Sequence, residues 1–99
     1  MKPVEASDFV GDWRGEWATN RGAWPAKLSV QQVGQGGEFV GVYTFWATPH
    51  DVRGTIQDNA LTFSLGRAHF KFTHQANGRM TVERTVDGEV TDTGVFEKA

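Results

Sequence analysis

Hydrophobic and polar residues alternate along most of the chain, beginning with residues 9–17, which read FVGDWRGEW. In an extended strand, Phe9, Trp13 and Trp17 would point to one side and the charged residues between them to the other. The same alternation recurs in residues 26–33, 38–46, 52–56, 61–65, 70–72, 80–86 and 90–96. No stretch shows helical periodicity for more than a turn, which we expect near Ser7. The pattern therefore predicts about eight short strands after one helical turn.

Turn-forming residues separate these strands. Asn77-Gly78 and Asp87-Gly88 suit tight hairpin turns, because their residues tolerate positive φ angles. Residues 18–25 (ATNRGAWP) are expected to form the longest loop, and residues 48–50 (TPH) are expected to end the third strand. Short connections between consecutive strands predict an up-and-down meander.

A closed barrel accounts for this meander better than an open sheet. An open sheet would expose two edge strands and one apolar face, whereas closure removes the edges and encloses that face. Inward glycines at positions 15, 41, 54 and 94 suit strongly curved strands. We expect an all-β fold: a single up-and-down antiparallel eight-stranded barrel with a short N-terminal helical turn, formed by residues 1–99 as one domain. A two-layer sandwich is the alternative.

Composition narrows the class of protein. The chain has 99 residues, of which 38% are hydrophobic, and suits one soluble domain. Its net charge of -2 comes from interspersed charges without a basic run, so we expect no nucleic-acid partner. Apolar runs are too short for a membrane helix, and no signal-peptide pattern opens the chain, so we expect a cytoplasmic protein without a membrane partner. With no cysteine, disulfides are excluded, and we predict no metal and no cofactor.

Both ends of the chain resemble a known superfamily. Residues 11–13 (GDW) resemble the glycine-x-tryptophan signature of the calycins, which include lipocalins, fatty-acid-binding proteins and avidins. Residues 94–98 (GVFEK) look like the last strand of the fatty-acid-binding and avidin families. The resemblance implies a minimal calycin-like barrel with Gly11, Trp13 and Lys98 as its structural signature. Trp13 would lie at the closed end, sealed by the N-terminal turn and close to Lys98.

Most residues that bind the ligand in these families are different in this chain. Avidins have an asparagine two residues after the first tryptophan and an aspartate two residues before the phenylalanine of the last strand, and here these positions are Gly15 and Gly94. Tyr43 resembles the ligand-binding tyrosine of avidins, but Phe45 replaces the serine two residues after it. The resemblance therefore implies a fold and not the identity of a ligand.

One rim of the barrel combines aromatic and polar residues. In a meander, the ends of odd-numbered strands and the starts of even-numbered strands lie at the same rim, and this is the rim meant here. The opposite rim has short turns and apolar residues. The candidate ligand-binding residues are Trp17, Trp24, Tyr43, Phe45, His50, Arg84 and Asp92. We expect a small hydrophobic or aromatic ligand to bind there without a covalent bond. Arg84 points inward and needs a partner, for which Asp92 is the candidate, and a purely structural pair is the alternative.

Two other functions fit the pattern. The interior could be filled by its own rings, which would leave a structural or protein-binding barrel. The outward residues Val40, Val42 and Trp46 form an apolar stripe that would suit a homodimer.

The third alternative is a small barrel enzyme of the cyclase or isomerase type, in which His50, Arg84 and Asp92 would move a proton. The chain has no serine nucleophile motif, phosphate loop or metal-binding helix motif, so we assign no catalytic residue and lean against an enzyme. His69 and His74 are five positions apart and face opposite sides of a regular strand. Each histidine is expected at the surface or at a rim.

Overall fold

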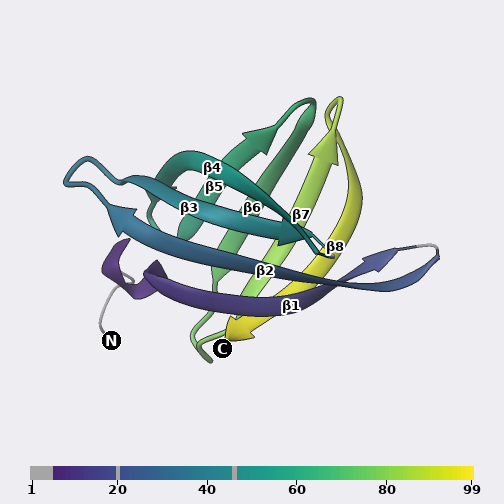
Figure 1. Ribbon diagram of the computed structural model, residues 1–99, viewed down its shortest axis with the longest axis horizontal. Helices are drawn as coiled ribbons and strands as arrows, with labels where there is room; N and C mark the ends of the chain where they lie inside the picture. The colour runs from purple at the N-terminus through teal and green to yellow at the C-terminus, as the bar shows by residue number, and fades with distance from the viewer. Residues whose placement is uncertain (1–5, 20, 46) are drawn as a thin grey trace.

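The computed structural model describes residues 6–19, 21–45 and 47–99 and shows a closed antiparallel barrel (Figure 1). The elements are η1 (Ala6–Phe9), β1 (Gly11–Thr19), β2 (Gly22–Val33), β3 (Glu38–Phe45), β4 (Thr48–Gln57), β5 (Ala60–Leu65), β6 (Ala68–His74), β7 (Met80–Val86) and β8 (Glu89–Lys98). Each strand pairs with the next, and β1 also pairs with β8. The predicted eight-stranded barrel is confirmed, and the sandwich alternative is wrong. Nothing in the described part of the chain is a helix long and apolar enough to cross a bilayer.

Aromatic rings fill the middle of the barrel. Phe63 stacks on Phe70 with ring centroids 4.9 Å apart and on Phe72 at 5.6 Å. The indole of Trp17 meets Phe70, Phe72 and Phe96 edge-on at 5.8–6.4 Å. Offset and edge-to-face contacts of this kind add roughly 0.5–1.5 kcal/mol per pair beyond the burial of the rings. The alternation seen in the sequence therefore becomes one continuous core.

One glycine on β1, Gly15, and one on β8, Gly94, allow the two strands to curve closely against each other. Trp17 pairs with Gly94, and Gly15 pairs with Phe96. A Cβ atom at position 15 would lie 2.8 Å from the Cα atom of Phe96, and one at position 94 would collide with the backbone carbonyl of Glu16. No side chain fits at either position without a backbone shift, so these glycines favour the close approach of the two strands.

The N-terminal turn closes one end of the barrel. η1 lies beside the start of β1 (Figure 1), and its Phe9 is completely buried. The Trp13 indole donates a hydrogen bond to the Phe9 carbonyl at 2.9 Å, and Lys98 Nζ lies 4.9 Å from the centroid of the Trp13 ring. Lys98 also donates to the Val10 carbonyl, and its Nζ atom lies 2.8 Å from the position that a Cβ atom on Gly11 would take. The contacts join the first and last strands at this end.

His74 packs against the side chains that fill the closed end of the barrel, whereas we had expected this histidine at the surface or at a rim. Its ring meets Phe9 at 5.6 Å and Trp13 at 5.8 Å, both edge-on. Its side chain lies on the same side of β6 as those of Phe70 and Phe72, so the alternation along this strand could have predicted its position. Its buried Nδ1 has no hydrogen-bond partner among the residues that the structure describes.

Two expected strand boundaries are wrong. The predicted loop at residues 18–25 is instead part of a long hairpin, because the ladder of β1 and β2 continues through Ala18↔Ala23 to Thr19↔Gly22. The predicted break at residues 48–50 is the first part of β4, where Pro49 pairs with Thr44. Turn-forming residues were read as breaks in both places, although small residues and an occasional proline are tolerated in a ladder.

Candidate ligand-binding site

The open end of the barrel contains a pocket of about 370 Å³, a volume typical of small-molecule sites. Its walls come from seven strands, all except β2, which is possible because a barrel brings alternate residues of every strand to one interior. The lining residues are Trp17, Tyr43, Phe45, His50, Leu65, Ala68, Phe70, Arg84 and Asp92. Most of this lining is apolar, and its polar groups are few, as in pockets that orient a ligand by a small number of hydrogen bonds.

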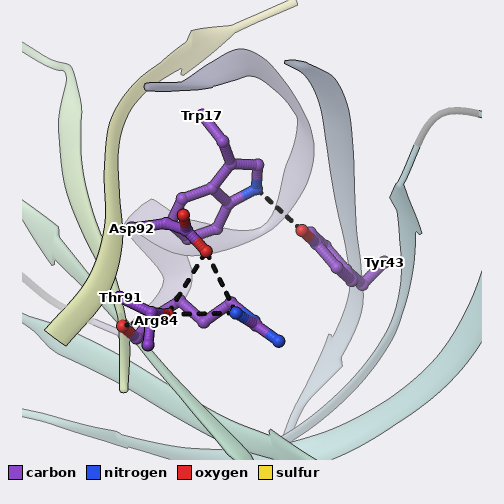
Figure 2. Close-up of polar contacts among 5 residues, drawn as sticks. All are labelled: Trp17, Tyr43, Arg84, Thr91 and Asp92. Atoms are coloured by element: carbon purple, nitrogen blue, oxygen red, sulfur yellow. Dashed lines mark hydrogen bonds and ion pairs between the residues drawn. The ribbon is translucent and has the colours of Figure 1, made fainter. Parts of the chain in front are cut away.

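Trp17 and Tyr43 are joined by a hydrogen bond at the base of the pocket. The Trp17 indole donates to the Tyr43 hydroxyl at 2.7 Å (Figure 2). Both side chains are almost fully buried, at 2% and 3% exposure. Burial raises the pKa of Tyr43 to about 12, because the phenolate would lose its hydration, although the Trp17 bond and the Arg84 charge oppose the rise. Tyr43 is therefore a neutral phenol at physiological pH.

Arg84 and Asp92 form an ion pair in the pocket wall. Arg84 Nη1 donates to Asp92 Oδ2 at 3.0 Å and to Thr91 Oγ1 at 3.0 Å (Figure 2). The side chains of Arg84 and Asp92 are 38% and 19% exposed. The pair is set by the register of β7 and β8, in which Arg84 faces Asp92 directly and Thr85 faces Val90. This irregularity leaves Thr91 as the extra residue of a bulge, and its hydroxyl reaches the guanidinium.

The structure brings together six of the seven residues predicted to bind a ligand. Phe45 and His50 lie at the mouth, where Phe45 is 37% exposed. Trp24 does not line the pocket: it lies on β2 opposite Trp17 and packs, half-buried, against the core. Trp24 had been placed in a loop over the rim, and the longer β1–β2 ladder explains why it is elsewhere. Trp46, from the predicted dimer stripe, lies outside the described residues.

Sequence reasoning missed four residues of the site. Leu65, Ala68 and Phe70 line the pocket beside the six residues that were expected. Leu65 and Ala68 flank the Gly66-Arg67 turn, and Phe70 lies two positions after Ala68 on the same side of β6, so the alternation beside this turn was the available signal. Thr91 had no signal in the sequence, because only the bulge in β8 turns its hydroxyl toward Arg84.

Two larger hollows, of about 780 and 420 Å³, lie on the outer face of the sheet. Their linings are mostly outward side chains, including Arg14 and Lys27 for the first and Lys71 for the second. They are open grooves where the strands bend, so we base no site on them. In the second groove, His69 Nδ1 lies 2.6 Å from Ser64 Oγ.

The three histidines lie in three separate places: His50 at the mouth, His69 on the outer face and His74 at the closed end. Within residues 6–19, 21–45 and 47–99, no three acidic or histidine side chains lie close enough to hold a metal ion.

The fold and the pocket define a class, that of small eight-stranded antiparallel β-barrels with one open end. No family model and no curated protein sequence matches the chain. Among solved structures, it is similar to a redesigned β-barrel, mFAP1, bound to DFHBI, with a TM-score of 0.63, 18% identity and coverage of 94% of this chain and 97% of that one. It is also similar to a protein of unknown function from the DUF3598 family of Nostoc punctiforme, with a TM-score of 0.55 and 15% identity. That match covers 100% of this chain and 50% of the other, and both likenesses concern the fold alone.

Proposed function

We propose that this protein binds a small apolar or aromatic molecule without a covalent bond, in the pocket at the open end of a calycin-like barrel. The observation that carries the proposal is the pocket of about 370 Å³, in which aromatic walls surround a few polar groups. Such a combination is the usual composition of a small-molecule site. The neighbouring barrel mFAP1, of nearly the same length, was solved with the small aromatic dye DFHBI, which is compatible with this function.

The contacts within the pocket also favour a preformed site. The Trp17–Tyr43 bond and the Arg84–Asp92 pair hold their side chains in place before any ligand enters. A ligand would then lose little free energy to the ordering of protein side chains, which is a main cost of binding.

A blocked pocket provides the test. Ala68 lines the pocket and is 7% exposed, so the ring of Ala68→Phe would occupy the space of the ligand. As a control, Ala23→Phe adds the same ring at an exposed position of the β1–β2 hairpin. We expect α-naphthol to shift the indole N–H resonance of Trp17 in wild type and in the control, but not in Ala68→Phe.

Native mass spectrometry of the three freshly purified proteins complements the titration. A small molecule that co-purifies with wild type and Ala23→Phe, and not with Ala68→Phe, would support the pocket as its site. If α-naphthol does not bind wild type, or binds Ala68→Phe equally well, the proposed function is wrong.

A further inference from the structure

The charge in the pocket wall is balanced. The guanidinium of Arg84 lies beside the carboxylate of Asp92, and the Thr91 hydroxyl lies 3.3 Å from that same carboxylate oxygen. An anionic ligand near Arg84 would be attracted by the guanidinium and repelled by the carboxylate at a similar distance. The pair therefore gives the pocket little preference for an anion, although it contains an arginine.

Tyr43 has a hydrogen-bond donor left over. The indole N–H of Trp17 can only donate, so in their 2.7 Å bond the Tyr43 oxygen accepts. The phenolic proton of Tyr43 is then available to another acceptor. No such acceptor occurs among the residues that the structure describes.

Arg84 also has donors left over. Its contacts with Asp92 and Thr91 both use Nη1, whereas Nε and Nη2 have no partner in the described part of the chain. Figure 2 shows the guanidinium reaching across the pocket toward the side on which Tyr43 lies. These donors are accessible, since the Arg84 side chain is 38% exposed, so a ligand in the pocket with an acceptor oxygen could accept hydrogen bonds from them.

The remaining walls suit a flat ring. Phe70 and Trp17 meet edge-on at 5.8 Å, and both line the pocket together with Leu65 and Ala68. These side chains offer apolar surface and no hydrogen-bonding group apart from the indole N–H, which is already used by Tyr43.

We propose that the ligand is an uncharged aromatic compound with a carbonyl oxygen, which accepts hydrogen bonds from the Tyr43 hydroxyl and a free Arg84 N–H group. This inference rests on the proposed function and adds the chemical class of the ligand. The ring lies against Phe70 and Leu65, and the balanced Arg84–Asp92 pair disfavours an aromatic carboxylate.

Three probes of similar ring size test it by isothermal titration calorimetry: α-tetralone, which has a neutral carbonyl, tetralin, which has none, and α-naphthoate, which is an anion. We expect wild type to bind α-tetralone about tenfold or more tightly than either of the others, since one or two hydrogen bonds are gained. The Tyr43→Phe variant should lose this advantage over tetralin and keep its affinity for tetralin itself.

Asp92→Asn gives the sharpest comparison. It removes the negative charge and leaves Arg84 uncompensated, so the preference should turn from α-tetralone toward α-naphthoate. Asp87→Asn is the matched control, because Asp87 pairs with Arg67 at an exposed turn outside the pocket. It changes the net charge equally and should keep the wild-type order of affinities.

The outcomes separate this inference from the proposed function. If wild type binds α-naphthoate more tightly than α-tetralone, or binds all three probes equally, and Ala68→Phe abolishes the binding, the chemical class is wrong and the pocket stands. If none of these three probes binds at millimolar concentration while α-naphthol still shifts the Trp17 resonance, the chemical class is wrong and the pocket stands. If α-naphthol does not bind either, both proposals are wrong. The wild-type comparison needs no variant to fold.

Discussion

The ionisation of Tyr43 provides a direct measure of how well the barrel encloses its pocket. Tyr43 is the only tyrosine of the chain, so its titration can be followed without overlap from another tyrosine. Burial raises its pKa from 10.0 to about 12. The Asp92 charge adds to the rise, whereas the Trp17 bond and the Arg84 charge reduce it. Raising the pH from 10 to about 12 therefore tests the environment of Tyr43.

The sign of the effect on stability follows from the two pKa values. Between pH 10 and about 12, Tyr43 keeps its proton in the folded protein and loses it in the unfolded chain. The unfolded state then binds fewer protons, so the free energy of unfolding falls as the pH rises. The full contribution of Tyr43 is present below pH 10, and the difference between the two pKa values corresponds to roughly 2–3 kcal/mol.

Urea unfolding of wild type and Tyr43→Phe across this range isolates the contribution of one residue. At neutral pH the variant should be less stable by about 1–2 kcal/mol, because the Trp17 indole N–H loses its acceptor. Above pH 10 only wild type has this tyrosine to ionise, so its advantage should shrink and then reverse as the pH approaches 12.

The tyrosinate absorbance of the folded protein supplies the decisive reading. If it rises with a midpoint near 10.0 while the barrel remains folded by circular dichroism, the phenol is hydrated and the enclosed base of the pocket is refuted. The reasoning would also be contradicted if the free energies of unfolding of wild type and Tyr43→Phe changed in parallel as the pH rises.

Three further predictions concern other parts of the barrel. Gly94→Ala should lower the free energy of unfolding, measured in urea, by about 1–3 kcal/mol, because the methyl group collides with a backbone carbonyl of β1. In the control Gly36→Ala, the methyl group meets only a flexible carboxylate, so the free energy of unfolding should change by less than about 0.5 kcal/mol. Lys98→Met should cost about 1–2 kcal/mol in the same assay, since the cation leaves the Trp13 ring and a carbonyl, and an unchanged value would mean that this contact is not stabilising. We also propose a homodimer through the outer face of β3, so Val42→Glu should convert dimer to monomer in size-exclusion chromatography with light scattering, and a monomeric wild type would disprove it.

Period-two alternation was enough to predict the barrel. Residues such as Trp13, Phe63 and Val82 lie inside because every second position of a meander must share one face. The strand boundaries were less predictable, because the continuation of β1 and β2 to Thr19 and Gly22 depends on the cross-strand ladder and not on local preference.

The site was predictable where it depends on parity and rim position, and not where it depends on local geometry. Tyr43 and Arg84 could be placed inside by counting residues from the turns. The hydrogen bond from Trp17 to Tyr43 could not be predicted, because it depends on the distance between β1 and β3, which are not neighbours in the ladder. The role of Thr91 required a bulge, which arises from the pairing of β7 with β8 and leaves no pattern in the sequence.

The two ends of the barrel differ in a way that selection for stability alone does not explain. At the closed end, large side chains such as Phe9 and Trp13 fill the interior. At the open end, the small side chain of Ala68 lines the same pocket as an ion pair and a phenol, and space remains. A larger apolar residue there would bury more surface, so Ala68→Phe should raise the melting temperature of the free protein while it abolishes binding of α-naphthol. Stabilising changes often carry such a cost at functional sites. A lower melting temperature would instead show that Ala68 is required for packing, and the argument that the open end is kept free for a ligand would fail.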